Sequence, residues 1–163
     1  SETLAVSIQA VMERPQDQAY QFPRCNRFMG RWLKHGEGYP DMSLRLFNRQ
    51  HAHWSNDAVH EFVQTDVSAG TLQGDLLHDS AASLVCYLEK QNRYTSLQAE
   101  KMYQAGKRAG AGKLLLNPLF RFFKFYLFRL GFLDGLPGLV HIYIGCQNTF
   151  IKYAKLREIA NGK

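Results

Sequence analysis

The feature that most restricts how this chain can fold is an aromatic and basic segment that runs from Leu119 to Leu130. Its charged residues are Arg121, Lys124 and Arg129, and all the others are Phe, Leu or Tyr. At 100° per residue of a helix, Asn117, Arg121 and Lys124 lie within about 60° of one another. Arg129 lies further round the same side. The pattern predicts a helix with a narrow cationic stripe on a wide aromatic body.

We expect this helix to lie at a membrane surface, because its charges interrupt the roughly 20 apolar residues that a spanning helix needs. In that position Phe122 and Phe125 would lie among acyl chains. The cations Arg121, Lys124 and Arg129 would lie at lipid phosphates. The alternative interpretation is a core helix whose cations extend to solvent along one edge.

The boundaries of the C-terminal region follow from its Asn, Pro and Gly residues. Asn117 and Pro118 are favourable at a helix N-cap and first turn, so we expect the aromatic helix to begin there. A second long helix is predicted from about Leu139 to Ile159, and residues 106–113 are expected to form a flexible basic hinge. We therefore predict a membrane-associated helical region over residues 106–163.

Residues 1–105 show the mixed pattern of an α/β fold. The expected elements are a helix from Ser1 to Glu13, extended segments at Tyr20–Cys25, Ser43–Phe47 and Thr71–His78, and a helix from about Asp79 to Ala105. Because proline cannot donate a ladder hydrogen bond, Pro23 predicts that the first extended segment lies at a sheet edge.

Composition narrows the function classes. The chain has 163 residues, 45% of them apolar, which is typical of one globular domain or a large piece of one. Its net charge of +6 suits nucleic acid, an anionic membrane or a phosphorylated substrate. No recognisable nucleic-acid module carries the basic residues, so nucleic acid is not an expected partner. The three cysteines lack CxxC spacing, which argues against a disulfide framework or a zinc knuckle.

Three polar side chains are candidates for chemistry. Asp57 and Glu61 are carboxylates at an expected loop-to-strand junction, where either could serve as a general base. Two solvated surface acids are the alternative interpretation. His78 closes an extended segment just before a helix, so it could be a metal ligand or a phosphate contact, although a lone histidine is more often structural.

In their order and combination the motifs resemble a known family. They are NRFMGRWLKHGEGYPDMSLRLFNR, WSNDAVHE, LLHDS, the Phe/Lys/Arg segment and FLDGLPG. This series is similar to the family 2 glycosyltransferases of lipopolysaccharide core assembly, in particular to core heptose glucosyltransferases. The resemblance covers essentially the whole chain. It implies a partial A-type glycosyltransferase domain of short strands and helices, whose acceptor side spans residues 1–105, followed by C-terminal amphipathic helices.

The resemblance also implies a donor and a metal ion, whose main binding residues are not found in this sequence. Enzymes of this family bind a nucleotide-sugar donor through a divalent metal, Mg²⁺ or Mn²⁺, held by an acidic motif that is missing here. His78 is the expected contact to that metal or to the diphosphate in this chain. Without a donor-binding half, the isolated chain is expected to be inactive.

The resemblance finally implies roles for individual residues. Glu61 matches the acceptor-activating base, with Asp57 as the rival, and the expected reaction is one inverting displacement at the anomeric carbon. The residues expected to bind substrate are His60, Arg31 and Arg45. For the two arginines, the reason is that the guanidinium fork suits phosphate. A strand-end salt bridge is the alternative for Arg45.

The implied function is therefore sugar transfer to a lipid-anchored lipopolysaccharide core, by a protein held peripherally at the cytoplasmic face of the bacterial inner membrane. The alternative function is a non-catalytic, basic and amphipathic module that binds membrane surfaces.

Overall fold

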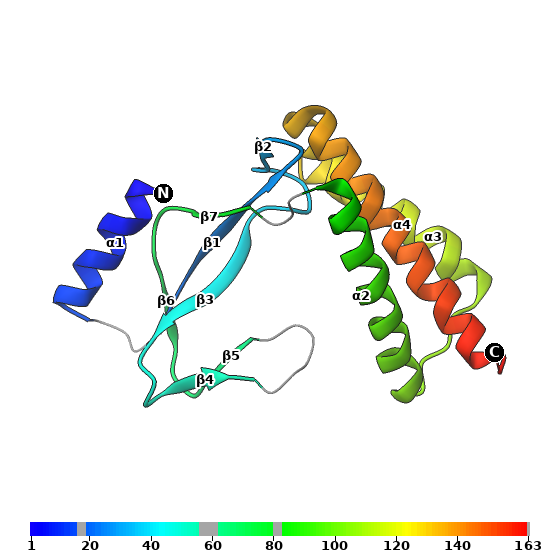
Figure 1. The fold of residues 1–163 in the computed structure, drawn as a ribbon, viewed down its shortest axis with the longest axis horizontal. Helices are drawn as coiled ribbons and strands as arrows, with labels where there is room; N and C mark the ends of the chain where they lie inside the picture. The colour runs from blue at the N-terminus through cyan, green and yellow to red at the C-terminus, as the bar shows by residue number, and fades with distance from the viewer. Residues whose placement is uncertain (16–18, 56–61, 80–82, 163) are drawn as a thin grey trace. The chain divides into compact units, whose positions relative to one another are not determined.

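The computed structural model describes residues 1–15, 19–55, 62–79 and 83–162 of the chain (Figure 1). Its helices and short strands confirm the predicted mixed α/β class. Contacts divide the chain into two compact units, which we describe separately. The first unit contains Ser1–Asn26 and Tyr39–His78, and the second contains Arg27–Gly38 and Asp79–Lys163.

The first unit begins with α1 (Glu2–Glu13), which confirms the predicted N-terminal helix. Its N-cap is Ser1, whose hydroxyl oxygen accepts a hydrogen bond from the backbone N–H of Leu4 at 3.3 Å. Leu4 is buried against Tyr20, Phe22 and Leu72 in the core of this unit. At Gly74 a Cβ atom would lie 2.4 Å from the backbone nitrogen of Leu4, so only glycine allows this close approach.

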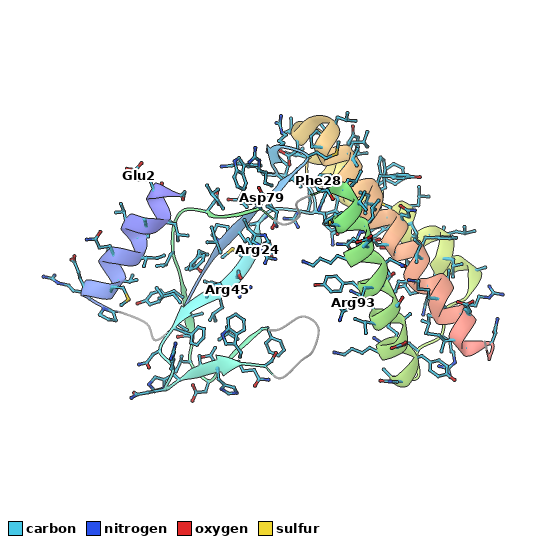
Figure 2. All side chains as sticks on the ribbon, in the orientation of Figure 1. Glu2, Arg24, Phe28, Arg45, Asp79 and Arg93 are labelled. Atoms are coloured by element: carbon cyan, nitrogen blue, oxygen red, sulfur yellow. The ribbon has the colours of Figure 1, made fainter. Side chains whose placement is uncertain are left out.

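One sheet is built around β1. Its strands are β1 (Ala19–Phe28), β2 (Arg31–Trp32), β3 (Asp41–Phe47), β6 (Ala69–Thr71) and β7 (Leu76–Asp79). The strand β3 pairs antiparallel with β1, and β6 pairs parallel with β1. Arg24 of β1, labelled in Figure 2, forms an ion pair with Asp41 of β3. A separate antiparallel pair joins β4 (Ala52–Trp54) to β5 (Val63–Thr65).

The prediction that Pro23 lies at a sheet edge is wrong, because β1 lies between β2 and β3 in the strand order. Pro23 is directly opposite Met42 of β3. The parallel pairing with β6 extends only from Ala19 to Gln21. Pro23 therefore lies beyond the β6 ladder, and its missing N–H breaks no hydrogen bond to β6.

The second unit is mostly helical. Its helices are α2 (Leu84–Gln104), α3 (Ala111–Phe123), the π-helix η1 (Lys124–Phe128), the 3-10 helix η2 (Gly131–Asp134) and α4 (Gly135–Ala160). The long helix α4 packs against both α2 and α3. Phe28, Leu33 and Ile144 form the buried centre of this unit.

Three helix starts differ from the predictions. The helix expected from Asp79 begins at Leu84, because Ser83 is its N-cap and accepts from the N–H of Cys86 at 3.2 Å. The aromatic helix begins at Ala111, not at Asn117, so it includes part of the expected hinge, and Pro118 lies inside it. The last helix begins at Gly135, four residues earlier than expected.

The junction between η1 and α4 is tightly packed. At Gly131 a Cβ atom would lie 2.3 Å from Cδ1 of Ile142 and 2.6 Å from the carbonyl oxygen of Phe125. Within the described part of the chain, no single helix is long and apolar enough to cross a membrane. Residues Ala111–Phe128 and Gly131–Ala160 meet the length and composition criteria as a pair, with a bend of 74° between them.

Candidate functional site

The predicted catalytic residues Asp57 and Glu61, together with His60, lie outside the described residues. The two residues that flank this segment are joined directly. The N–H of Ser55 donates to the carbonyl oxygen of Phe62 at 2.8 Å, and the N–H of Phe62 donates to Oγ of Ser55 at 3.2 Å. The general-base assignment therefore stays a prediction.

Two predicted substrate contacts of the first unit have neighbours within that unit. Nδ1 of His78 lies 2.9 Å from Oδ1 of Asn26. Nε of Arg45 donates to Oγ of Ser43 at 3.0 Å, and the Arg45 guanidinium lies 4.8 Å from the centre of the Trp54 ring. Cation–π stacking thus orients Arg45.

The described residues do not fit a divalent metal. Across residues 1–15, 19–55, 62–79 and 83–162, no group of three or more His, Cys, Asp or Glu side chains is placed to hold an ion. Nδ1 of His78 already faces the amide oxygen of Asn26, so this nitrogen is not available to a metal ion. A metal contact at His78 stays a prediction.

Arg31 belongs to a cluster around the buried carboxylate of Asp134, whose side chain is 3% exposed. Its Nη2 donates to the carbonyl oxygen of Leu133 at 3.0 Å, and its Nε lies 3.9 Å from Oδ1 of Asp134. The backbone N–H groups of Lys34 and His35 donate to Oδ2 of Asp134 at 3.0 and 2.8 Å. Arg31 therefore connects the β2 strand to the turn before α4.

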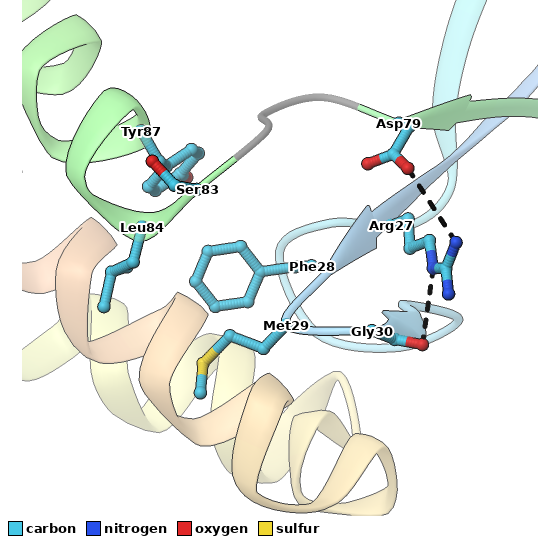
Figure 3. Close-up of a pocket in the computed structure, with 8 residues that line it drawn as sticks. All are labelled: Arg27, Phe28, Met29, Gly30, Asp79, Ser83, Leu84 and Tyr87. Atoms are coloured by element: carbon cyan, nitrogen blue, oxygen red, sulfur yellow. Dashed lines mark hydrogen bonds and ion pairs between the residues drawn. The ribbon is translucent and has the colours of Figure 1, made fainter.

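A pocket of about 510 Å³ opens in the second unit between the β1–β2 turn and the start of α2 (Figure 3). We call it the turn pocket. It is lined by Arg27, Phe28, Met29, Gly30, Asp79, Ser83, Leu84 and Tyr87. Pockets of this size are typical of small-molecule sites. None of the eight was predicted as a site residue, because they become neighbours only when the turn folds against α2.

The turn pocket has an aromatic wall and a polar edge. The rings of Phe28 and Tyr87 meet edge to face with centroids 5.2 Å apart, and burial raises the pKa of Tyr87. At the opposite side, Nη1 of Arg27 lies 3.9 Å from Oδ2 of Asp79, and Nε of Arg27 donates to the carbonyl oxygen of Gly30 at 3.4 Å (Figure 3).

His141 of α4 supports the aromatic wall from behind, with its ring centroid 5.2 Å from that of Phe28. Burial lowers the pKa of His141 to about 4, and the nearby positive charge of Arg121 adds to the decrease, while Asp134 opposes it. The folded chain therefore holds this imidazole neutral at pH values where an unfolded chain would protonate it.

This histidine predicts acid sensitivity. Between pH 6.5 and about 4 the unfolded chain binds a proton that folded His141 does not, so the free energy of unfolding should fall by up to about 3 kcal/mol as the pH decreases through this window. Urea unfolding at pH 7, 5.5 and 4 measures it. His141→Leu should remove most of the slope, whereas His53→Gln, at an exposed position, should leave it. Equal slopes for all three proteins would contradict the assignment.

The predicted membrane cation Arg121 is committed to an internal ion pair. Nε of Arg121 donates to Oε2 of Glu37 at 3.1 Å, its Nη2 pairs with Oε1 of Glu37, and its Nη1 donates to Oγ1 of Thr149 at 3.1 Å. Burial lowers the pKa of Arg121. A Cβ atom at Gly145 would lie 2.4 Å from Oε2 of Glu37, so a glycine leaves room for the pair.

The other predicted membrane residues divide into two groups. Lys124 and Arg129 are exposed, with their charged ends 5.4 and 5.8 Å from the Phe125 ring centre. Phe122 and Phe125 are half-buried, and Phe122 stacks on Tyr126 at 5.1 Å. The predicted stripe is therefore divided, since Arg121 holds the helices together and the other two cations face outward.

Large apolar side chains are nevertheless exposed along α3, η1, η2 and the start of α4. Eleven of them are 44–81% exposed, and we call them the apolar surface residues: Leu115, Leu116, Leu119, Phe120, Phe123, Leu127, Phe128, Leu130, Phe132, Leu133 and Leu136. Six cations and no acid lie between Lys107 and Leu133. Large exposed apolar patches are typical of interaction surfaces, so these residues are candidates for one.

This chain has a mixed α/β fold, a ligand-sized pocket and a basic, apolar helical face. Its sequence is similar to those of several proteins named as glycosyltransferases. It is 30% identical over 119 residues to the lipopolysaccharide core biosynthesis glycosyltransferase LpsC of Rhizobium meliloti (strain 1021), covering 71% of this chain and 44% of that protein. An uncharacterized glycosyltransferase of Rickettsia felis is 32% identical over 123 residues, covering 70% and 44%. A third, RT0209 of Rickettsia typhi, is 28% identical over 126 residues, covering 72% and 43%.

The chain thus spans less than half the length of the curated relatives that it matches. No protein-family model and no solved structure matches it. The similarity supports the glycosyltransferase part of the predicted resemblance and its link to the lipopolysaccharide core. The assignment to family 2 stays a prediction.

Proposed function

We propose that this chain is the acceptor-side part of an inverting family 2 glycosyltransferase that adds a sugar to the lipopolysaccharide core. The observation that carries the proposal is the sequence similarity to LpsC, a lipopolysaccharide core biosynthesis glycosyltransferase, over 71% of the chain. A nucleotide-sugar donor and its divalent metal would be bound mainly by residues outside this chain. A transfer assay, argued in the Discussion for Glu61, tests the proposal.

The proposed reaction is a single displacement. Glu61 would take the proton of the acceptor hydroxyl while that oxygen attacks the anomeric carbon of the donor sugar. The bond from the anomeric carbon to the nucleoside diphosphate breaks on the opposite face, so the configuration inverts and no covalent sugar–enzyme intermediate forms. Asp57 is the rival base, and His60 and Arg45 are expected to contact substrate near it.

We further propose that the chain binds peripherally to the cytoplasmic face of the bacterial inner membrane through the apolar surface residues. The exposed rings and leucines would enter the acyl boundary, and Lys124 and Arg129 would contact anionic headgroups. The absence of acidic residues between Lys107 and Leu133 favours a negatively charged partner.

Backbone conformation supports a role for two of the exposed apolar side chains. Met29 and Leu130 have φ values of +46° and +55°, a region that costs a residue other than glycine roughly 1–2 kcal/mol. These residues are 53% and 46% exposed, so packing inside the chain compensates for only part of this cost. An apolar partner outside the chain would explain why a bulky residue stands at each position.

The strained leucine gives a test with two opposite readouts. Asparagine tolerates positive φ, so Leu130→Asn should leave the free energy of unfolding unchanged or raise it by up to about 1 kcal/mol. The melting temperature should therefore stay the same or increase. Removing the inserted leucine should weaken binding to anionic vesicles about tenfold. Sedimentation with vesicles measures binding, and Val85→Ala at an exposed site on α2 is the control. Unchanged vesicle binding would show that Leu130 does not insert.

Charge reversal tests the headgroup contacts. Each cation near an anionic surface contributes about 1 kcal/mol, so Lys124→Glu with Arg129→Glu should weaken binding to anionic vesicles at least 30-fold or so. Arg121 is left intact because it pairs with Glu37. The matched control, Arg93→Glu with Lys101→Glu on α2, makes the same change in net charge. An equal loss in the control would mean that only overall charge matters.

The alternative function, a non-catalytic membrane-surface module, is favoured by the apolar surface residues alone. It predicts the same vesicle results but no sugar transfer in any protein that joins this chain to a donor-binding half. The transfer assay therefore separates the two functions.

A further inference from the structure

We infer that the turn pocket binds an uncharged sugar ring of the acceptor saccharide, so that the second unit holds both the saccharide and its lipid anchor. The inference rests on the proposed function for the identity of the ligand. It adds a binding site in a part of the chain that the expected catalytic residues do not occupy.

The aromatic wall matches the apolar face of a sugar ring. The rings of Phe28, Tyr87 and His141 contact one another, with the Phe28 centroid 5.2 Å from each of the other two and those two 6.0 Å apart. Because Tyr87 of α2 and His141 of α4 hold the buried Phe28 ring, this wall is rigid, and Tyr87 and Leu84 extend it. Figure 3 shows Leu84 beside Phe28, so a sugar ring against this wall would contact both side chains.

The polar edge matches the hydroxyl groups of a neutral sugar. Every hydroxyl both donates and accepts hydrogen bonds, and this edge offers a donor in Arg27 beside an acceptor in Asp79. The side chains of these residues are 46% and 64% exposed and their charged atoms are 3.9 Å apart, so each keeps a solvent-facing side. Their charges cancel, which disfavours an isolated phosphate and favours an uncharged ring.

The turn that forms one side of the pocket is held in a fixed shape. Phe28 is opposite Arg31, which leaves Met29 and Gly30 as a two-residue turn, both with positive φ. Strained residues of this kind concentrate at ligand sites. A Cβ atom at Gly30 would meet nothing within 4 Å, so the side of the turn at Gly30 is open to a ligand.

The same unit connects the pocket to the proposed membrane surface. Arg31, directly after the turn, donates to the carbonyl oxygen of Leu133, an apolar surface residue. Met29 lines the pocket and is itself exposed and apolar. A saccharide whose lipid enters the bilayer beside Leu133 would therefore extend toward the turn pocket.

Methionine methyl NMR tests the site with few signals, since the chain has four methionines. The chain carrying ¹³C-methyl methionine is titrated with deacylated lipopolysaccharide core oligosaccharide, which has no acyl chains and so reports no membrane binding. We expect the Met29 signal, assigned with Met29→Leu, to shift and saturate. The signals of Met12, Met42 and Met102, which do not line the pocket, should stay in place.

The variant Asp79→Asn should weaken this titration about tenfold or more, because a charged acceptor becomes a neutral amide. Asp66→Asn, outside the pocket, should not change it. Absence of a Met29 shift at millimolar oligosaccharide, or equal shifts of all four signals, would overturn the inference. The same Met29 shift with inorganic phosphate alone would show an anion site instead. A Met29 shift, combined with no sugar transfer by a protein that joins this chain to a donor-binding half, would support the pocket and reject the proposed function.

Discussion

Replacing Glu61 with glutamine is expected to lower sugar transfer by about 10²–10⁴-fold, the contribution typical of a positioned general base. Glutamine keeps the size of the side chain but cannot take the proton of the acceptor hydroxyl. The measurement is transfer from a radiolabelled nucleotide sugar to lipopolysaccharide core acceptor, by a protein that joins this chain to a donor-binding half. Binding of the donor should survive, because the residue is expected to act on the acceptor.

The rival carboxylate supplies the control for this experiment. Asp57→Asn should reduce transfer far less if Glu61 is the base, and the two results should exchange if Asp57 is the base. Full activity of both variants would reject a general base in this segment. Loss of donor binding together with transfer would instead indicate that the substitution disturbs the fold.

Replacing Asp134 with alanine is expected to destabilise the folded chain by about 3–5 kcal/mol, as for the loss of a partner in a buried charge cluster. The carboxylate is 3% exposed and accepts from the N–H groups of Lys34 and His35. Alanine would leave both donors without this acceptor, at about 1–3 kcal/mol each. Oδ1 also lies 3.1 Å from Nδ1 of His35, so this contact is lost too.

Urea unfolding at pH 7 measures the loss. Asp134→Asn should cost less than alanine, because its amide oxygen can still accept from one or both N–H groups. Asp66→Ala, at an exposed carboxylate, should change the free energy of unfolding by less than about 0.5 kcal/mol. If Asp134→Ala is no worse than this control, the carboxylate does not join the β2 strand to α4.

Asp134 also shows why part of the site escaped prediction. It lies in the FLDGLPG motif, which carried the family resemblance, but the spacing of that motif says nothing about Lys34 or His35. Its partners are about 100 positions away in sequence. A motif can therefore mark an important segment without indicating which contacts its residues make.

The pattern of charges on one helix was similarly incomplete. Periodicity placed Arg121, Lys124 and Arg129 on one side, and the structure keeps Lys124 and Arg129 exposed. Arg121 instead faces Glu37 and Thr149, which come from a different strand connection and a different helix. Periodicity gives the direction of a side chain from its own helix axis, whereas the neighbour that it meets depends on how other elements pack.

Local chemistry was sufficient to predict the elements whose ends carry their own signals. The Ser1 hydroxyl caps α1, and the strand expected at Ser43–Phe47 lies within β3. The same local rules misplaced the start of the aromatic helix at Asn117, since packing of α3 against α4 keeps the helix continuous through Pro118. A proline costs a limited amount of helix stability, and tertiary contacts exceeded it here.

By itself the sequence determined the mixed α/β class, the first helix and the wealth of aromatic and basic residues near the C-terminus, because each depends on neighbours within a few positions. Only the tertiary structure decided that Phe28 and Tyr87 share a pocket and that Arg121 forms an ion pair with Glu37. It also decided that Met29 and Leu130 are exposed with positive φ angles. These depend on contacts between distant segments, and the free energy that selects such contacts comes from burial and pairing that no local pattern records.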